Sequence, residues 1–186
     1  MSENNKVYLS FGRHGRYGMD TAIDHTSMVE AFCVGRRMAK IFPACRTVFH
    51  SPLRRAELTA KFRGLGLDCP HIICRQELEE ETPKFTIRQF VDNVIKSAEK
   101  DERHFHFVTH LPVIEKLGLP DLSTCGVCWC EANNWDEMLA ENYEVRVLPE
   151  EPKEEMFKVL QKIMIAPEDL WQFSPNAIYS ALNRIK

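Results

Sequence analysis

The sequence lacks long apolar runs, and no stretch approaches the roughly 20 residues that a helix needs to cross a bilayer. Residues 1–5 are polar and lack the pattern of a secretory signal peptide. The chain also lacks an excess of positive charge, since 24 basic and 27 acidic residues give a formal net charge of −3. Such a balance provides no general attraction for nucleic acid or anionic membranes. We therefore expect a cytoplasmic protein with no nucleic-acid or membrane partner.

The 186 residues also contain no internal repeat, low-complexity tract or domain linker. A chain of this length buries roughly 70% of the surface that it exposes when unfolded, which is enough for a hydrophobic core. We expect a single domain over residues 1–186 with a helical extension from about residue 152. The role of this extension and the oligomeric state are left open.

The seven cysteines are an odd number at irregular spacing, so they do not indicate a complete disulfide framework. Cys125, Cys128 and Cys130 lie close together and could suggest a metal site. A structural zinc site requires a matching pair of Cys or His residues nearby, however, and the sequence has none there. We interpret residues 125–130 as a strand with small apolar side chains, and we expect no bound metal.

An alternating apolar run over residues 6–11 stops at the tetrapeptide Gly12-Arg13-His14-Gly15. The alternation predicts a short buried strand, and the glycines allow a sharp turn after it. Arg13 and His14 would then project from the carboxyl end of the strand, where open α/β sheets bind their ligands. A guanidinium group suits phosphate, and an imidazole can act as nucleophile or proton carrier. Residues 16–26 lack periodicity and are expected to form a loop over this site.

Two later strand-like segments also end in polar motifs. Residues 47–51 precede a helix with Arg55 near its N-terminus, where free backbone N–H groups and the helix dipole favour an anion. We expect this helix to end at Gly64–Gly66. The strand over residues 105–109 ends at His110. The simplest alternative is that these basic side chains have only structural roles.

The strand over residues 105–109 has a second feature. Phe105 and Phe107 alternate with His106 and with His104, which directly precedes the strand. This alternation predicts that His104 and His106 face away from the core and take no part in chemistry. Because strands alternate with helices along the chain, the sheet should be covered by helices on both faces.

In this order, the motifs Arg-His-Gly, Ser-x-x-x-Arg-Ala-x-x-Thr-Ala and Thr-His-Leu-Pro resemble those of the histidine phosphatase superfamily. That superfamily includes phosphoglycerate mutases, acid phosphatases and bacterial phosphohistidine phosphatases, and the resemblance runs from about residue 6 to residue 132. The second and third motifs are most similar to the phosphohistidine phosphatase branch. The resemblance implies a phosphoglycerate mutase-like fold, which is a three-layer αβα sandwich with a mostly parallel central sheet.

The resemblance also implies a metal-independent phosphatase without a cofactor. His14 would attack phosphorus and form a phosphohistidine intermediate. Arg13 and Arg55 would bind the phosphoryl oxygens as bidentate donors, and His110 would donate a further hydrogen bond in its protonated form. Water would then cleave the intermediate.

Two further residues are candidates. Mutase-like members of the family carry Leu-x-Glu in an acidic loop, which maps onto Glu80 as the acid that protonates the leaving group. Arg16 is a candidate for an additional phosphate contact, and the alternative is a solvated charge. The Arg-His-Gly-Arg form departs from the Arg-His-Gly-Glu and Arg-His-Ala forms that are common in the family, which leaves the substrate open.

The implied substrate is phosphohistidine on a protein or a related phosphate monoester. The chain is too short for the large inserted cap of the acid phosphatases. One alternative is a small-molecule phosphomonoesterase or mutase-like enzyme. Another, from a different class, is a non-catalytic domain that binds a phosphorylated ligand.

Overall fold

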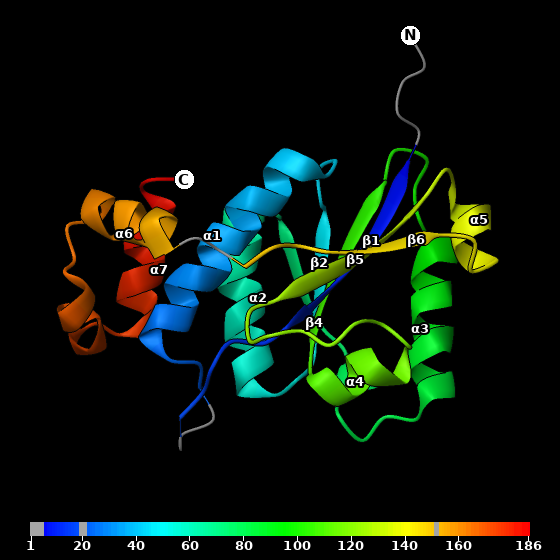
Figure 1. Cartoon of the computed structure of the whole chain (residues 1–186), viewed down its shortest axis with the longest axis horizontal. Coiled ribbons are helices and arrows are strands. Elements are labelled where there is room, and N and C mark those ends of the chain that lie inside the picture. Colours follow the sequence, from blue (N-terminus) through cyan, green and yellow to red (C-terminus); the bar gives the residue numbers. More distant parts are fainter. Residues whose placement is uncertain (1–5, 19–21, 151–152) are drawn as a thin grey trace, which may run out of the picture.

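The computed structural model describes residues 6–18, 22–150 and 153–186. In this part of the chain six strands form one sheet in the order β3-β2-β4-β1-β5-β6 (Figure 1). The four strands from β3 to β1 pair in parallel, whereas β5 pairs antiparallel with β1 and with β6. The bounds of the strands are β1 Val7–Arg13, β2 Thr47–His50, β3 His71–Cys74, β4 His104–Thr109, β5 Val127–Ala132 and β6 Glu144–Val147.

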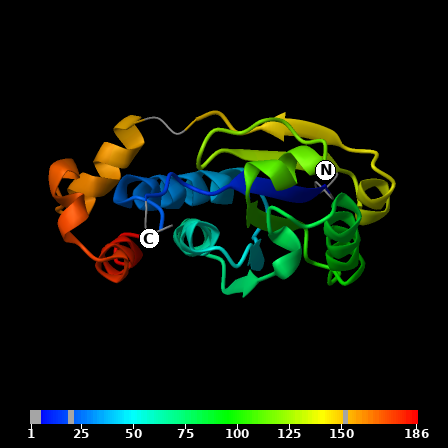
Figure 2. The ribbon, with the colours of Figure 1, turned by 90° about the horizontal axis from the view of Figure 1, so that it is seen from below.

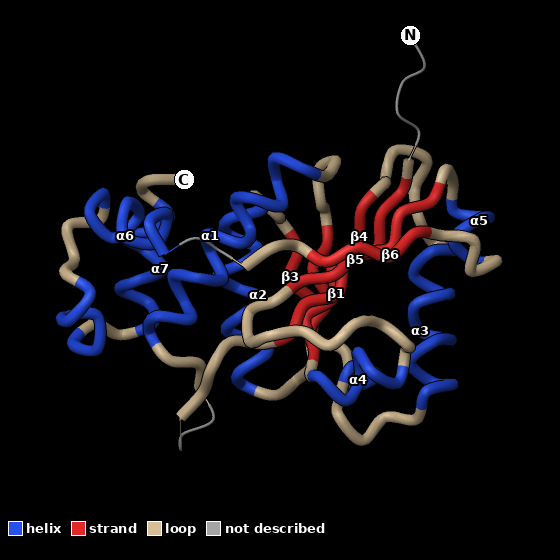
Figure 3. The backbone as a smooth tube through the Cα atoms, in the orientation of Figure 1, coloured by secondary structure: helices blue, strands red, loops and turns tan. Residues whose placement is uncertain are grey.

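Helices cover both faces of this sheet, as the alternation of strands and helices predicts (Figures 1 and 3). One face carries α1 (His25–Ile41) and α2 (Arg54–Leu67). The other face carries α3 (Lys84–Lys96), α4 (Leu111–Lys116) and α5 (Trp135–Leu139), and a 3₁₀ turn η1 (Gln76–Leu78) precedes α3. The sheet and its two helical layers form a three-layer sandwich.

The C-terminal helices form a further group against α1, at one end of the molecule (Figure 2). They are α6 (Lys153–Lys162), the 3₁₀ segment η2 (Pro167–Gln172) and α7 (Pro175–Asn183). Their buried side chains, among them Leu160 and Ile178, pack with those of α1 and α2. None of the helices in the described part of the chain is long and apolar enough to span a membrane.

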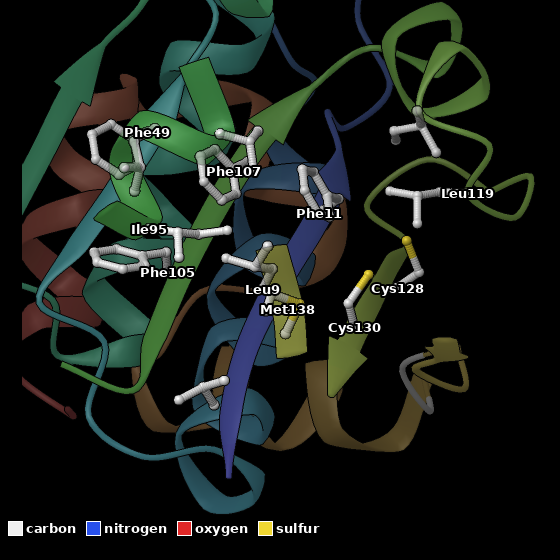
Figure 4. Packing of buried hydrophobic residues seen from close by; sticks show 14 of the residues in the cluster. Leu9, Phe11, Phe49, Ile95, Phe105, Phe107, Leu119, Cys128, Cys130 and Met138 are labelled. Atoms are coloured by element: carbon white, nitrogen blue, oxygen red, sulfur yellow. The ribbon is translucent and has the colours of Figure 1, made fainter. Parts of the chain in front are cut away.

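The core on the α3 side is built on aromatic rings from adjacent strands (Figure 4). Phe11, Phe49 and Phe107 stack with ring centroids 5.0 to 5.4 Å apart. Cys128 and Cys130 on β5 belong to the same cluster, which fits their interpretation as small apolar strand residues. Cys125 differs from the prediction, because it lies in the turn before β5 with a φ of 60°.

Helix α2 does not end at Gly64–Gly66 but continues to Leu67. Asp68, with a left-handed φ of 59°, ends the helix, and its N–H donates to the carbonyl oxygens of Gly64 and Leu65. The glycines instead serve the close crossing of α1 and α2. A Cβ atom on Gly66 would lie 2.2 Å from the carbonyl oxygen of Phe32, and one on Gly35 would lie 2.2 Å from that of Arg63. These glycines therefore allow two helix backbones to touch, and they do not end the helix.

The prediction that His104 and His106 face away from the core is wrong. Both point to the opposite face from the phenylalanines, but that face is covered by α1 and α2, so they are only 1% and 0% exposed. Ser10 on β1 links them, since its Oγ lies 2.7 Å from Nε2 of His104 and 2.8 Å from Nδ1 of His106. In a sheet covered on both faces, the side that faces away from one core faces another.

Candidate active site

Three neighbouring strands end at one edge of the sheet, and a polar residue follows each of them directly. His14 follows β1, Ser51 follows β2 and His110 follows β4. Because β4 lies between β1 and β2 and all three run parallel, their carboxyl ends share this edge. The rings of His14 and His110 accordingly lie with their centroids 5.1 Å apart. The sheet thus brings together two histidines that are far apart in the sequence.

The contacts of His14 fix the position of its ring proton. Nδ1 lies 2.7 Å from the carbonyl oxygen of Gly15, which can only accept, so Nδ1 carries the proton and donates it. Nε2 accepts a hydrogen bond from Nε of Arg55 at 3.2 Å. The main-chain N–H of His14 donates to the carbonyl oxygen of Thr109 at 3.0 Å. The imidazole is therefore neutral, and its lone pair lies on Nε2, which faces the guanidinium group of Arg55.

Arg55 lies in the first turn of α2 and faces His14 from the side. Its Nη2 donates to Oε1 of Glu80 at 2.5 Å. Its Cζ lies 4.7 Å from the centre of the Tyr17 ring, and that ring lies 5.3 Å from the ring of His14. Of the loop predicted over residues 16–26, Tyr17 therefore contacts the site, whereas residues 19–21 lie outside the described residues and residues 25 and 26 already belong to α1.

Glu80 and His110 complete the cluster. Nδ1 of His110 lies 3.1 Å from Oε1 of Glu80, and Nε2 lies 2.8 Å from Oγ of Ser51. The acidic loop is held in place by Lys116 on α4, whose Nζ donates to the carbonyl oxygens of Glu80 at 2.5 Å and of Thr82 at 3.1 Å. One carboxylate oxygen therefore lies between the guanidinium group of Arg55 and the ring of His110.

Arg13 approaches the same edge but is partly committed to the backbone. Its Nη1 donates to the carbonyl oxygen of Leu122 at 2.8 Å. Its Nε is buried and has no hydrogen-bond partner among the described residues. Its positive charge is one of the causes that lower the pKa of His14. Arg13 therefore contributes positive charge at the site, while its Nη1 bonds to the backbone.

Arg16 is not brought into this cluster. Its side chain is 60% exposed, and its Nε lies 3.5 Å from Oδ2 of Asp24. Asp24 also accepts the main-chain N–H of Ser27 at 2.6 Å and so caps α1. The alternative of a solvated charge describes this position better than a phosphate contact.

Burial sets the protonation state of both histidines. Burial, together with the charges of Arg55 and Arg13, lowers the pKa of His14 to about 4. Burial, with His14 and Arg55 nearby, lowers the pKa of His110 to about 3. Both rings are thus neutral near pH 7 in the free protein, whereas the resemblance implies a protonated His110. A phosphoryl dianion in the site would raise the pKa of His110, because negative charge stabilises the imidazolium form.

Three residues of the site were not candidates from the sequence, namely Ser51, Thr59 and Tyr17. Ser51 bonds to His110, and Thr59 on α2 both accepts from the main-chain N–H of Gly15 at 2.9 Å and donates to the carbonyl oxygen of Arg55 at 2.7 Å. Both lie within the second motif, so that motif was the available signal. Tyr17 lies in a loop without periodicity and had no such signal.

His14, Glu80 and His110 also offer ligand atoms that lie within 4.8 Å of one another. Two imidazoles and a carboxylate are a known ligand set for zinc. A cation here would have to compete with the guanidinium group of Arg55, which already holds Glu80. The arrangement of charge is therefore better suited to an anion than to a metal ion.

No protein-family model and no curated protein matches the sequence. Solved structures do match the fold. The protein histidine phosphatase SixA, solved with tungstate, gives a TM-score of 0.63 at 16% sequence identity, and the match covers 75% of this chain and 94% of SixA. A mycobacterial glucosyl-3-phosphoglycerate phosphatase gives a TM-score of 0.57 at 15% identity and covers 76% of this chain and 97% of its own.

A third structure, mycobacterial hydrolase 2, gives a TM-score of 0.60 at 14% identity and covers 82% of this chain and 96% of its own. The neighbours are thus matched almost end to end, while part of this chain lies outside the shared fold. The predicted fold class is confirmed: the chain has the phosphoglycerate mutase-like fold of these phosphatases.

Proposed function

We propose that this chain is a phosphatase that works through a phosphohistidine intermediate on His14. Its substrate is phosphohistidine on a protein or a related phosphate monoester. The observation that carries the proposal is the neutral His14 ring, whose lone pair on Nε2 lies 3.2 Å from Nε of Arg55. An unprotonated nucleophile beside a fixed guanidinium group is what attack on a phosphoryl group requires.

In the first step Nε2 of His14 attacks phosphorus in line. The new N–P bond forms while the bond to the leaving group breaks, and the leaving group takes the bonding electrons. Arg55 and Arg13 offset the charge on the equatorial oxygens. In the second step water attacks the phosphohistidine, the N–P bond breaks, and inorganic phosphate leaves with the neutral ring restored.

Glu80 has a defined part in this scheme. In the free protein its carboxylate bonds to Arg55, and Nδ1 of His110 lies 3.1 Å from the same oxygen. A phosphoryl group that binds Arg55 displaces the carboxylate. The displaced group takes up a proton from solvent beside the negatively charged phosphoryl group, and as a carboxylic acid it protonates the leaving group. Two proteins of this fold were solved with tungstate and with inorganic phosphate, which supports a site for a tetrahedral oxyanion.

The position of Glu80 also favours a second candidate, a small-molecule phosphomonoesterase or mutase-like enzyme. An alkoxide is a poor leaving group and needs a proton, whereas an imidazole leaves more readily. A carboxyl group 3.1 Å from His110 is therefore of most use with an oxygen ester. The activities of the matched proteins, which act on phosphohistidine and on glucosyl-3-phosphoglycerate by their names, span the same two classes.

The test compares phosphate release from a phosphohistidine peptide and from a panel of phosphate monoesters. His14→Ala should abolish both turnover and the acid-labile phosphoenzyme that is trapped with labelled substrate. Arg54→Ala is the matched control, since Arg54 is exposed and bonds to Glu57 outside the site. Near-normal turnover by His14→Ala would refute the mechanism. Phosphate binding without turnover of any substrate would instead indicate a non-catalytic binding domain.

Glu80→Gln separates the two substrate classes. This variant keeps a side chain of the same size but cannot donate the proton of a carboxylic acid. We expect it to slow hydrolysis of alkyl phosphates at least tenfold more than hydrolysis of the phosphohistidine peptide. An equal loss on both substrates would mean that Glu80 is not the acid for the leaving group.

A further inference from the structure

Arg63 on α2 carries a charge in an unusual place, because its side chain is completely buried. Its Nη1 donates to Nε2 of His106 at 3.2 Å, and its Nη2 donates to the carbonyl oxygen of Cys125 at 2.8 Å. The charge of Glu30 acts on it through space, but its hydrogen-bond acceptors are an imidazole and a carbonyl group. Burial of a guanidinium group with neutral partners is unfavourable for folding, so a contribution to stability does not explain why Arg63 is buried.

The acceptor at Cys125 belongs to a turn that is bonded to the candidate catalytic residues at three points. The main-chain N–H of Cys125 donates to the carbonyl oxygen of His14 at 3.2 Å, and that of Arg13 donates to Gly126 at 3.0 Å. The side chain of Arg13 donates to the carbonyl oxygen of Leu122 at 2.8 Å. Segment 122–126 therefore fixes both the backbone of Arg13 and His14 and the direction of the Arg13 side chain.

Arg63 also lies directly against β1 just before these two residues. A Cβ atom on Gly12 would lie 1.8 Å from Nη1 of Arg63, so only glycine leaves room for the guanidinium group. On its other side His106 accepts from Arg63 and, being neutral, donates from Nδ1 to Oγ of Ser10. The guanidinium group is thus held from β1 and β4, and it can hold the turn in a fixed place.

We propose that Arg63 is a positioning residue for the phosphate site: through the carbonyl oxygen of Cys125 it holds segment 122–126, and that segment holds Arg13 and His14. This inference rests on the proposed function for its kinetic consequences, but its geometry does not depend on turnover. Cys125 has a left-handed φ of 60°, a conformation that a residue other than glycine adopts at a cost. The hydrogen bond from Arg63 to Cys125 offsets that cost.

The test uses Arg63→Met, which keeps the length of the side chain but removes its charge and donors, and Arg63→Lys, which restores the charge and one donor. Lys61→Met is the matched control, because Lys61 is exposed on the same helix and bonds to Glu57. Melting curves and circular dichroism first establish a temperature at which each variant is folded. At that temperature kcat, KM and the Kd for inorganic phosphate are measured.

We expect Arg63→Met to lower kcat at least tenfold and to raise the Kd for phosphate several-fold, Arg63→Lys to recover part of both, and the control to match the wild type. Wild-type values of kcat, KM and Kd in folded Arg63→Met, with only a lower Tm, would overturn the proposal.

If Arg63→Met does not fold, Gly126→Ala replaces it. A Cβ there would lie 2.8 Å from the carbonyl oxygen of Ser123, so the turn must shift while Arg63 stays intact. Wild-type values of kcat, KM and Kd in Gly126→Ala would also overturn the proposal.

A readout without substrate separates this proposal from the proposed function. Long-range ¹H–¹⁵N spectra of labelled histidine report whether His14 keeps its proton on Nδ1. We expect Arg63→Met to lose this single tautomer, because the main-chain position of His14 is no longer fixed. If the wild type shows no turnover yet the tautomer depends on Arg63, the proposed function fails and the positioning role stands. An unchanged His14 signal refutes the positioning role whatever the activity.

Discussion

The pH dependence of activity gives the most direct test of the site. His14 can attack only when Nε2 is unprotonated, and burial with two neighbouring arginines lowers the pKa of His14 to about 4. At pH 5 a group with that pKa is about 90% unprotonated, whereas a histidine with the ordinary pKa of about 6.5 is only about 3% unprotonated. The two cases thus differ about 30-fold in active enzyme at pH 5. We expect kcat/KM to persist to pH 5 and to fall as the pH passes through about 4.

The assay is kcat/KM for an aryl phosphate between pH 3.5 and 8, corrected for the ionisation of the substrate itself. This ratio reports the ionisation of the free enzyme. The same pKa is read independently from the histidine NMR signal that disappears in His14→Ala. Circular dichroism at each pH shows where acid unfolding begins, so that loss of fold is not mistaken for protonation of His14.

An acid limb with a midpoint near pH 6.5, in folded protein, would refute the reasoning. It would mean that His14 is solvated and that Arg13 and Arg55 do not act on it. A midpoint near 4 in the NMR titration without the matching limb in kcat/KM would show instead that another group controls the rate.

Three further predictions concern stability and metal dependence. Burial lowers the pKa of His104 to about 3, whereas a histidine in the unfolded chain has a pKa of about 6.5. Between pH 7 and 5 the unfolded state therefore binds this proton and the folded state does not, which lowers the free energy of unfolding by about 2 kcal/mol. Measured by urea unfolding, the free energy of unfolding of His104→Phe should fall by about 2 kcal/mol less than that of the wild type between pH 7 and 5. An equal fall in both proteins would contradict the buried position of His104. Gly66→Ala should lower the free energy of unfolding by about 1–3 kcal/mol, because its Cβ meets the α1 backbone, and an unchanged melting temperature would disprove the close crossing. EDTA should leave activity unchanged, since Arg55 supplies the positive charge beside Glu80, and an activity restored only by a divalent metal would refute that mechanism.

Much of the site could be predicted from local sequence patterns. The alternating run before Arg13 marks a buried strand, and the same kind of signal precedes Ser51 and His110. Parallel strands end at a common edge, so residues that directly follow them are expected to meet. The position of Arg55 in the first turn of a helix follows from the same local reasoning.

Other features depended on contacts between distant segments. Arg16 was a candidate by its closeness to His14 in sequence, yet its side chain bonds to Asp24 at the start of α1. His104 and His106 alternate with apolar residues, a pattern that also fits a sheet with one face in solvent. Only the packing of α1 and α2 on that face makes it a second core. Nothing local marks Arg63 as buried, because arginine in a helix is most often exposed.

The sequence by itself determined which elements form and which of them end in reactive side chains, because strand periodicity, glycine and helix-start signals act over a few residues. The tertiary structure alone decided that β4 lies between β1 and β2, and hence that His14 and His110 face each other. It also decided that Glu80 lies against Arg55 and that Arg63 lies beneath Gly12. Burial, electrostatic shifts of pKa and the space for a side chain depend on which distant segments pack together, and no pattern of neighbouring residues specifies that.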